Sequence, residues 1–441
     1  MHITHLQIEN LRSFAKAEVD LNLPGKKTAM ALPNVNVFLG SNGLGKTSVL
    51  RAAALATLGP LLSGGSGFVP DGLVRRLPGK EIPSTKASIS ARITLAAGEL
   101  PNVVQRAQSD KPLTLTTTVI RRTSERLTSE TQPKSLAADL EDLLYGDDSS
   151  AYFVAGYGAT RRVESSTRVD ESARIKARLR RYERVASLFE DHLGLMPLSY
   201  WLPAYATRNR GRYVQVVNLI NRLLPDACRM HDSATSTDSG KEHLFDMNGI
   251  TLPFRALSDG YRAYIGWIGD MLFHLCMGAG RGEKLVDTQG VVMVDEIDLH
   301  LHPEWQRVVI PTLAKELPNI QFIMTTHSPL VVGSLEASNL FMLAEEDGAT
   351  IIKRLPERVH GRSADQILLS PYFGLESTRA PDVAAGLQSL AQKTVGGDPE
   401  ASMQYLRILS GGMPKKEMNA LVKSASPGPR KAVVSKRARK A

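Results

Sequence analysis

The segment that most constrains the fold of this chain is the eight-residue sequence GSNGLGKT at residues 40–47. The apolar stretch Val35–Leu39 predicts a buried strand directly before it, and the apolar spacing over Thr47–Leu58 predicts a helix directly after it. The segment matches G-x-x-x-x-G-K-[ST] in the strand–loop–helix context that a phosphate-binding loop requires. We call residues 40–47 the phosphate loop, and an accidental match in a flexible loop is the weaker interpretation.

Each residue type in the phosphate loop has a chemical reason to be there. Glycines allow backbone N–H groups to close around phosphate oxygens, the Lys46 ammonium supplies a positive charge, and the Thr47 hydroxyl can bind Mg²⁺. We therefore expect the chain to bind ATP and Mg²⁺. The residues expected to contact the nucleotide are Gly40, Ser41, Asn42, Gly43, Leu44, Gly45, Lys46, Thr47 and Ser48.

A second apolar strand, predicted at Gly290–Val294, ends in the adjacent acids Asp295 and Glu296. Ligands bind at the carboxyl ends of strands in open parallel sheets. We expect Asp295 to be a metal residue together with Thr47, and Glu296 to be the catalytic general base that activates the attacking water. A surface acid pair after a core strand is the weaker alternative beside a phosphate loop.

Two further strand and helix ends carry candidate residues. Ser258, Asp259 and Gly260 begin the apolar helix predicted at Asp259–Met277, and a helix N-terminus with a hydroxyl can bind an anion. The alternative is that Ser258 only caps this helix. His327 follows the apolar strand predicted at Ile320–Thr325, where it is either a catalytic residue that contacts the γ-phosphate or a structural histidine.

The strand pattern predicts an α/β fold. Two continuous apolar strands flank a helix predicted at residues 303–316, which indicates parallel strands buried on both faces. Alternating segments at His2–Glu9 and Ala17–Leu23 predict further strands near the N-terminus, and Gly240–Phe254 predicts a hairpin. Residues 161–212 are charged and have helical spacing.

Charge and cysteine content narrow the class of protein. The net charge is +9, but residues 411–441 hold nine Lys or Arg and one acid, so the rest of the chain is nearly neutral. Such a tail is either disordered or a nucleic-acid contact. Two cysteines exclude a disulfide scaffold, and the most apolar stretches, such as residues 264–279, are interrupted by Asp270, His274 and several glycines. We expect a cytoplasmic protein with no membrane span.

A cluster of basic residues lies within the charged segment 161–212. These residues could contact the phosphates of a nucleic acid. Because Glu171 and Glu183 lie among them, a solvated helix face or an interface with a partner protein is at least as good an interpretation. The cluster comprises Arg174, Lys176, Arg178, Arg180, Arg181 and Arg184.

These elements, in this order, resemble the ABC-type ATPases, and most closely their RecF/SMC/OLD-like branch. The match is to stand-alone bacterial AAA family ATPases, similar to the ATPase subunits of the anti-phage systems Septu and PARIS, and it covers about residues 1–375. OLD-like nucleases add a Toprim domain, whose acidic pattern we do not find after residue 330. The segments that carry the resemblance are Ile8–Phe14, Tyr157–Arg161, Asp295–Gln306 and Thr326–Pro329.

The resemblance implies a mixed-sheet ABC-ATPase head with an N-terminal antiparallel lobe and a helical insertion. It also implies that Lys46 of one protomer and Ser258 of another enclose the same ATP, so that the protein works as a homodimer or higher homo-oligomer. The expected parts are an N-terminal ATPase lobe (1–130), a helical Arg-rich insertion (131–245), a C-terminal ATPase lobe (246–375), a helical segment (376–422) and a disordered basic tail (423–441).

Three positions depart from the family pattern. Asp259 replaces the second glycine of transporter signatures, Gln105 is the first glutamine after the phosphate loop and leaves the usual Q-loop residue displaced or missing, and His302 replaces the D-loop aspartate of repair relatives. The first two weaken a transporter function.

We therefore expect an ATP-hydrolysing ATPase that acts as a nucleotide-switched sensor or regulator of a separate effector, a nuclease, in anti-phage defence. The alternative is a RecF-like DNA-binding ATPase of repair and maintenance.

Overall fold

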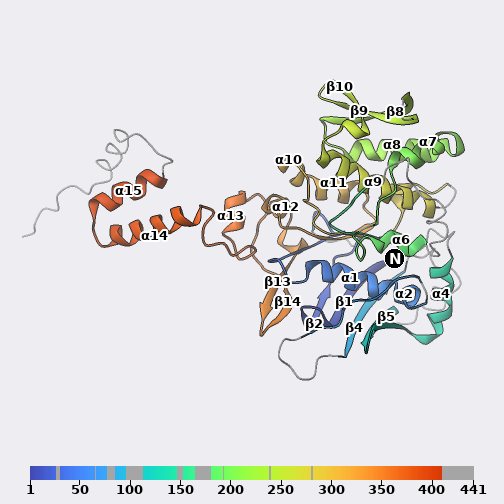
Figure 1. Ribbon diagram of the computed structural model, residues 1–441, viewed down its shortest axis with the longest axis horizontal. Coiled ribbons are helices and arrows are strands. Elements are labelled where there is room, and N and C mark those ends of the chain that lie inside the picture. Colours follow the sequence, from blue (N-terminus) through green and yellow to red (C-terminus); the bar gives the residue numbers. More distant parts are fainter. Residues whose placement is uncertain are drawn as a thin grey trace, which may run out of the picture. The chain divides into compact units, whose positions relative to one another are not determined.

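Six strands form a mixed sheet at the centre of the larger of two units in this computed structural model (Figure 1). Five strands run parallel, and the edge strand β14 is antiparallel to its neighbour. Four of the parallel strands, β3, β7, β11 and β12, are buried along their whole length, because both faces of the sheet are covered. In sheet order the strands are β14 (Ala349–Lys353), β13 (Leu340–Glu346), β3 (Val35–Leu39), β12 (Ile320–Thr325), β11 (Gly290–Val294) and β7 (Phe153–Tyr157).

The larger unit is Met1–Gly374 and the smaller is Leu375–Ala441. In the smaller unit, α14 (Pro381–Val395) and α15 (Pro399–Leu409) contact each other. The structure describes residues 1–25, 30–64, 66–76, 85–95, 113–146, 152–163, 180–191, 193–237, 240–279 and 282–409. Gln105, Arg174, Lys176, Arg178 and the basic tail therefore lie outside the described residues.

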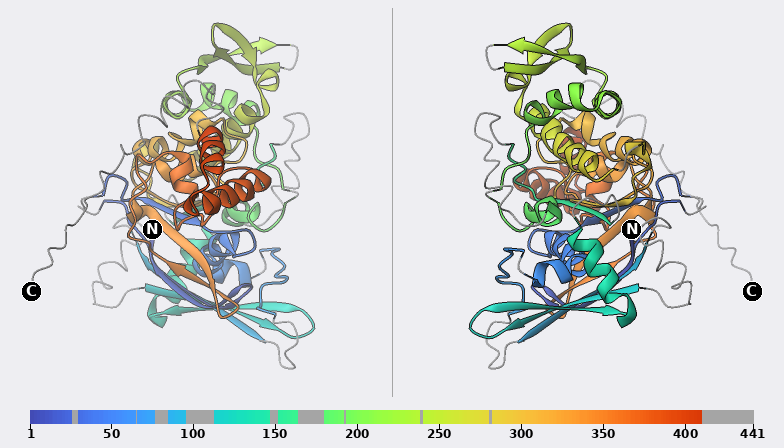
Figure 2. Two further views of the ribbon diagram at one scale, coloured as in Figure 1. Left: turned by 90° about the vertical axis from the view of Figure 1, so that its left-hand side faces the viewer. Right: turned by 90° about the vertical axis from the view of Figure 1, so that its right-hand side faces the viewer.

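One face of the central sheet is covered by α1 (Lys46–Thr57), which lies between this sheet and a five-stranded antiparallel sheet (Figures 1 and 2). Because α1 is enclosed by both sheets, ten of its residues are buried. The alternating pattern near the N-terminus does form strands, with one polar and one buried face. The antiparallel strands, in order, are β2 (Phe14–Asp20), β1 (His2–Leu11), β4 (Lys86–Thr94), β5 (Leu113–Arg121) and β6 (Glu125–Gln132).

Four helices pack on the opposite face, and a three-stranded sheet lies beyond them (Figure 2). The longest helix of this layer buries Trp267, whose ring lies 5.7 Å from that of Tyr157 in the central sheet. The helices are α7 (Leu198–Arg208), α8 (Arg210–Leu223), α9 (Asp259–Gly278) and α11 (Val309–Glu316), and the strands are β8 (Cys228–Thr237), β9 (Gly240–Met247) and β10 (Ile250–Pro253).

Short helices complete the larger unit. No helix among the described residues is both long and apolar enough to cross a membrane. The short helices are α2 (Gly59–Ser63), α4 (Ala137–Tyr145), α6 (Arg180–Ala186), α10 (Pro303–Gln306), α12 (Pro329–Gly333) and α13 (Ala364–Leu368).

The helix predicted at 303–316 is two helices, α10 and α11, separated at Arg307 and Val308. Pro311 supplies the physical reason, since it has no N–H to donate to the carbonyl of Arg307 in a continuous helix. The range 131–245, expected as a helical insertion, also contains the core strand β7, the strand β8 and part of β9.

The predicted role of the basic cluster is wrong for Arg181 and Arg184, which are only 2% and 3% exposed. Arg181 donates hydrogen bonds to the carbonyls of Tyr152 (2.8 Å) and Gly146 (3.2 Å). The Arg184 guanidinium lies 5.2 Å from the ring centre of Phe153. These two side chains therefore fix α6 against β7 and cannot track phosphates or form a solvated face.

Candidate nucleotide-binding site

The phosphate loop leaves the end of β3 and leads directly into α1, as the sequence predicts. The Lys46 side chain turns back over the loop, where its ammonium donates to the carbonyls of Gly40 (2.9 Å) and Ser41 (3.1 Å). Burial lowers the pKa of Lys46, and the nearby acids oppose that shift. The Lys46 ammonium is therefore held against the loop, where it could pair with a phosphate group bound by the loop N–H groups.

The turn between β1 and β2 supports the phosphate loop from below. The Ser13 hydroxyl donates to the carbonyl of Leu44 at 3.2 Å. Gly45 has a φ of +88°, and a Cβ there would lie 2.5 Å from the Ser13 hydroxyl and 2.9 Å from the Phe14 ring. The Ile8–Phe14 segment, which carries part of the family resemblance, thus contacts the phosphate loop through Ser13 and Phe14.

Replacing Gly45 with alanine should destabilise the protein and weaken ATP binding more than replacing Gly43. Both glycines have positive φ values, +88° and +86°, so alanine at either costs about 1–2 kcal/mol in backbone strain. Only Gly45→Ala adds the collision with Ser13 and Phe14, because no atom lies within 4 Å of a Cβ at Gly43. Urea unfolding and ATP titration of both variants measure the difference. Equal losses in the two variants would contradict a supporting role for the turn.

Asp295, at the end of β11, joins the phosphate loop to β12. Its two carboxylate oxygens accept hydrogen bonds from Thr47 Oγ1 at 2.7 Å and from Thr325 Oγ1 at 2.6 Å. Asp295 is 4% exposed, so both bonds lie away from bulk water. The structure brings Thr47 and Asp295 together as the sequence predicts, and it adds Thr325 as the residue that orients the carboxylate.

The donor set of this pair fits Mg²⁺. A hydroxyl and a carboxylate are hard oxygen ligands, and Mg²⁺ in nucleotide sites is held by one or two carboxylates together with phosphate oxygens and water. Thr47 and Asp295 are the residues that would hold the ion. When bound, Mg²⁺ neutralises charge that develops on the phosphate oxygens.

Glu296 has an unusual backbone that is fixed on both sides. Its φ is +46°, in the left-handed region that residues other than glycine rarely adopt. Its N–H donates to Thr325 Oγ1 at 2.7 Å, and its carbonyl accepts from Arg161 Nη2 at 2.8 Å. Thr325 thus orients both members of the acid pair, and Arg161 holds the residue expected to act as the base.

His327 lies at the same edge of the sheet, between β12 and α12. Burial lowers its pKa and the charge of Lys46 lowers it further, against the opposing effect of the site acids. The imidazole is therefore neutral at neutral pH. It also lies close enough to Lys46 for the charge of Lys46 to lower its pKa. Its backbone N–H lies 3.4 Å from Asp298 Oδ1, which also accepts a hydrogen bond of 2.5 Å from Thr326 Oγ1.

Ser258, Asp259 and Gly260 begin α9, as predicted. Ser258 occupies the N-cap position, but its side chain makes no capping hydrogen bond, so capping does not account for the hydroxyl. Asp259 forms an ion pair with Arg262, and Gly260 lies so close to the His300 carbonyl that a Cβ there would approach it to 2.4 Å. The ion pair lies within α9, and the approach of Gly260 to His300 ties the segment to the loop after β11. Neither contact involves the phosphate loop.

Sequence reasoning missed the supporting roles of Thr325, Asp298 and Arg161. Thr325 could have been found from the parallel pairing, because the carboxyl ends of β11 and β12 must meet at one edge. Arg161 lies only four residues after β7, which pairs in parallel with β11 on its other side. No spacing in the sequence identifies β7 as the neighbour of β11, since 132 residues lie between the last residue of β7 and the first residue of β11.

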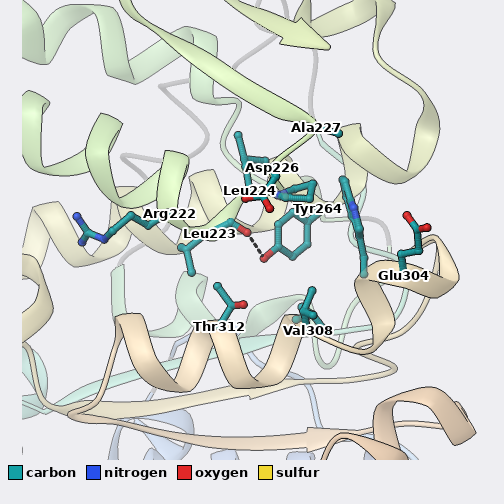
Figure 3. A pocket seen from close by; sticks show the side chains of 12 residues that line it. Arg222, Leu223, Leu224, Asp226, Ala227, Tyr264, Glu304, Val308 and Thr312 are labelled. Atoms are coloured by element: carbon teal, nitrogen blue, oxygen red, sulfur yellow. Dashed lines mark hydrogen bonds between the residues drawn. The ribbon is translucent and has the colours of Figure 1, made fainter. Parts of the chain in front are cut away.

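A pocket of about 480 Å³ lies apart from these residues, between the end of α8 and the α10–α11 segment (Figure 3). Tyr264 points into it and donates to the carbonyl of Leu223 at 3.0 Å. Burial raises the pKa of Tyr264, so this hydroxyl remains a donor at neutral pH. None of the expected nucleotide-binding residues lines this pocket, which is formed by Arg222, Leu223, Leu224, Pro225, Asp226, Ala227, Tyr264, Glu304, Trp305, Val308, Val309 and Thr312.

A phosphate loop, an acid pair at a neighbouring strand end and a helix-start signature, on a mixed sheet beside an antiparallel lobe, define the class as an ABC-type ATPase head. Two family models match the chain. One, described as an AAA domain, covers residues 5–191, and the other, described as an AAA domain, putative AbiEii toxin, Type IV TA system, covers residues 170–333. Each model matches less than half of the chain, and together they span residues 5–333, so the chain is similar to AAA-domain ATPases over most of its length.

Curated relatives carry defence and repair names. The chain is 24% identical to Septu protein PtuA of Bacillus mycoides over 385 residues, covering 86% of this chain and 46% of that protein. It is 33% identical to the Retron Ec83 probable ATPase of Escherichia coli over 162 residues, 36% of this chain and 29% of that protein. It is 27% identical to DNA replication and repair protein RecF of Streptomyces avermitilis over 248 residues, 53% of this chain and 58% of that protein.

The chain thus spans less than two thirds of the length of these relatives. Among solved structures, an SMC head bound to the C-terminal winged-helix domain of ScpA has a TM-score of 0.49 and 14% identity, over 80% of this chain and 98% of that one.

Proposed function

We propose that the chain binds and hydrolyses ATP at the edge formed by β3, β11 and β12. The observation that carries this proposal is the contact of Thr47 with Asp295 at 2.7 Å, with Glu296 next in the chain. In this proposal the contact joins the phosphate loop to the carboxylate that would bind the metal, and the candidate base is the next residue in the chain. The similarity to two AAA-domain models supports the same activity.

Each residue has a distinct role in this proposal. Lys46 and the loop N–H groups bind the phosphates, Thr47 and Asp295 hold Mg²⁺, and Glu296 accepts a proton from the attacking water. His327, neutral and near Lys46, contacts the γ-phosphate. Phosphate release by the purified chain, measured with and without Mg²⁺, tests the activity. A Lys46→Ala chain that hydrolyses ATP as fast as the wild type would refute the site.

Ser258 supports a shared site. Its hydroxyl makes no capping hydrogen bond. Among the described contacts of residues 258–260, none is with the phosphate loop of the same chain. We infer that Ser258, Asp259 and Gly260 of one copy bind the nucleotide held by Lys46 of another, in a homodimer or higher homo-oligomer.

We propose further that the ATP cycle regulates a separate effector, a nuclease, in defence against phages, within the cytoplasm. The similarity to proteins named for the Septu and retron systems supports this role. Co-expression with the product of the adjacent open reading frame, followed by size-exclusion chromatography, tests it. Co-elution that depends on ATP would support regulation, and separate elution with and without ATP would refute it for that partner.

A RecF-like function in DNA repair is the second candidate, and the similarity to RecF of Streptomyces avermitilis supports it. Hydrolysis stimulated by DNA in the absence of any partner would favour this function. Regulation of a co-purifying nuclease would favour defence.

Deleting residues 423–441 should weaken DNA binding if the tail contacts nucleic acid. The deletion removes seven Lys or Arg and no acid. Each lost phosphate contact should flatten the dependence of log affinity on log salt by about 0.9 on duplex DNA. ATP hydrolysis without DNA should not change, because the proposed site residues all precede residue 330. Titration of labelled DNA at three salt concentrations measures both quantities, and identical affinities and slopes would show that the tail has no such role.

A further inference from the structure

We propose that Arg161 is a positioning residue that holds the backbone of Glu296 in the geometry required for hydrolysis, and that it thereby controls turnover and not ATP affinity. This inference rests on the proposed ATPase function. It assigns a role to a residue of the segment after β7, which belongs to neither the phosphate loop nor the acid pair.

The first support is the contact itself. Arg161 Nη2 donates to the carbonyl oxygen of Glu296 at 2.8 Å. On the other side of the same residue, the Glu296 N–H donates to Thr325 Oγ1 at 2.7 Å. These two bonds enclose a residue with a φ of +46°, which an unrestrained glutamate would leave for a more favourable conformation. The Leu299 N–H also donates to the Glu296 carbonyl, at 2.9 Å. Arg161 therefore supplies one of three hydrogen bonds that hold a backbone that is intrinsically disfavoured, and the only one of the three from the segment after β7.

The second support is the environment of the guanidinium. Arg161 is 7% exposed, and its Nη1 atom is buried with no hydrogen-bond partner among the described residues. Burial lowers the pKa of Arg161 to about 10, against the charges of Asp295, Asp298 and Glu296, so the side chain remains cationic at neutral pH. A buried cation with an unused donor is costly unless nearby anions compensate for it. The site acids provide that compensation.

The third support is the way the segment is anchored. The Asp295 N–H donates to the Tyr157 carbonyl at 2.8 Å, which extends the pairing of β7 with β11 up to the acid pair. Six residues after Tyr157, Val163 bridges to Leu195, and the Leu195 N–H donates to the Arg162 carbonyl at 2.7 Å. Arg161 thus lies between the catalytic edge and the segment that enters α7. A shift of α7 that moves the Arg162–Leu195 contact would therefore act on Glu296 through the Arg161 side chain.

The test compares three variants of the full chain. Arg161→Met removes every donor but keeps a long side chain, Arg161→Lys keeps the charge and one donor direction, and Arg162→Met changes the adjacent, exposed arginine as the matched control. For Arg161→Met we expect kcat to fall about 10- to 100-fold, the effect of a modest misplacement of a reacting group. KM for ATP should change less than about threefold, a limit well below the tenfold that marks a lost binding contact. Arg161→Lys should recover part of kcat, and Arg162→Met should behave as the wild type.

A second readout separates positioning from a general structural role. In a Glu296→Gln background, Arg161→Met should cause little further loss, because both changes act on the same step and their effects are not additive. A thermal unfolding midpoint and an ATP titration accompany each variant. Restoration of kcat in an Arg161→Ala chain by added guanidinium ion would identify the missing group directly.

Several results would overturn the inference. They are an unchanged kcat in Arg161→Met, a KM rise that accounts for the whole loss, an additive loss in the Glu296→Gln background, or a loss of ATP binding and stability that Arg161→Lys shares. If the wild-type chain itself does not hydrolyse ATP, the proposed function fails and the inference fails with it. If the wild type is active and Arg161→Met is equally active, only the inference fails.

Discussion

Replacing Glu296 with glutamine should leave ATP binding intact and lower steady-state hydrolysis by about 10²–10⁴-fold, the usual contribution of a general base. Glutamine keeps the length of the side chain and the backbone bonds to Thr325 and Arg161, but it cannot accept a proton. ATP affinity and phosphate release are measured on the same preparation. Glu345→Gln, an exposed acid on β13 at the other side of the sheet, is the control.

The variant also bears on the nucleotide switch. A chain that binds ATP and cannot hydrolyse it should accumulate in the ATP-bound assembly, so its elution volume with ATP should differ from that of the wild type. Hydrolysis at the wild-type rate would remove Glu296 from the role of base.

Replacing Ser258 with arginine should abolish ATP-dependent association and hydrolysis while each chain still binds nucleotide. The start of α9 is free of capping bonds from Ser258, so a bulky cation there should disturb what this segment contacts in another copy and not the helix itself. Light scattering and nucleotide titration on one sample test both halves of this expectation.

Mixing provides the complement to that result. Ser258→Arg chains retain an intact phosphate loop, and Lys46→Ala chains retain an intact helix start. A mixed dimer would therefore contain one complete shared site, and hydrolysis should return when the two inactive proteins are combined. Mixtures that stay inactive at every ratio would argue that the two motifs do not meet between copies.

Local motifs in the sequence predicted the strand–loop–helix around Lys46 because its cause is local. An apolar strand, a glycine-rich turn and a helical pattern follow one another without interruption. The acid pair was predicted for the same reason. The break between α10 and α11 also has a local cause, in Pro311, but the apolar periodicity on both sides concealed it.

What could not be predicted depends on contacts between distant segments. Arg181 and Arg184 have the sequence pattern of a solvated basic helix, yet both are buried. Carbonyls before β7, at Tyr152 and Gly146, accept hydrogen bonds from Arg181, and Phe153, the first residue of β7, presents its ring to Arg184. The support of Gly45 by Ser13 and of Glu296 by Arg161 likewise depends on which strands become neighbours. Neither hydropathy nor spacing encodes that order.

The contact between the β1–β2 turn and the phosphate loop has a consequence for the order of folding. Ser13 lies beneath the loop, and its carbonyl accepts hydrogen bonds from the Arg75 side chain and from the Thr350 N–H, the latter at 3.0 Å. At the start of β1, the Ile3 N–H donates to Gln321 Oε1 at 2.8 Å. The first hairpin is therefore held by residues made more than 300 positions later. Closing such long loops is slow, so a ribosome must pass residue 350 before the site can assume its final form, and nascent chains shorter than this should not retain ATP.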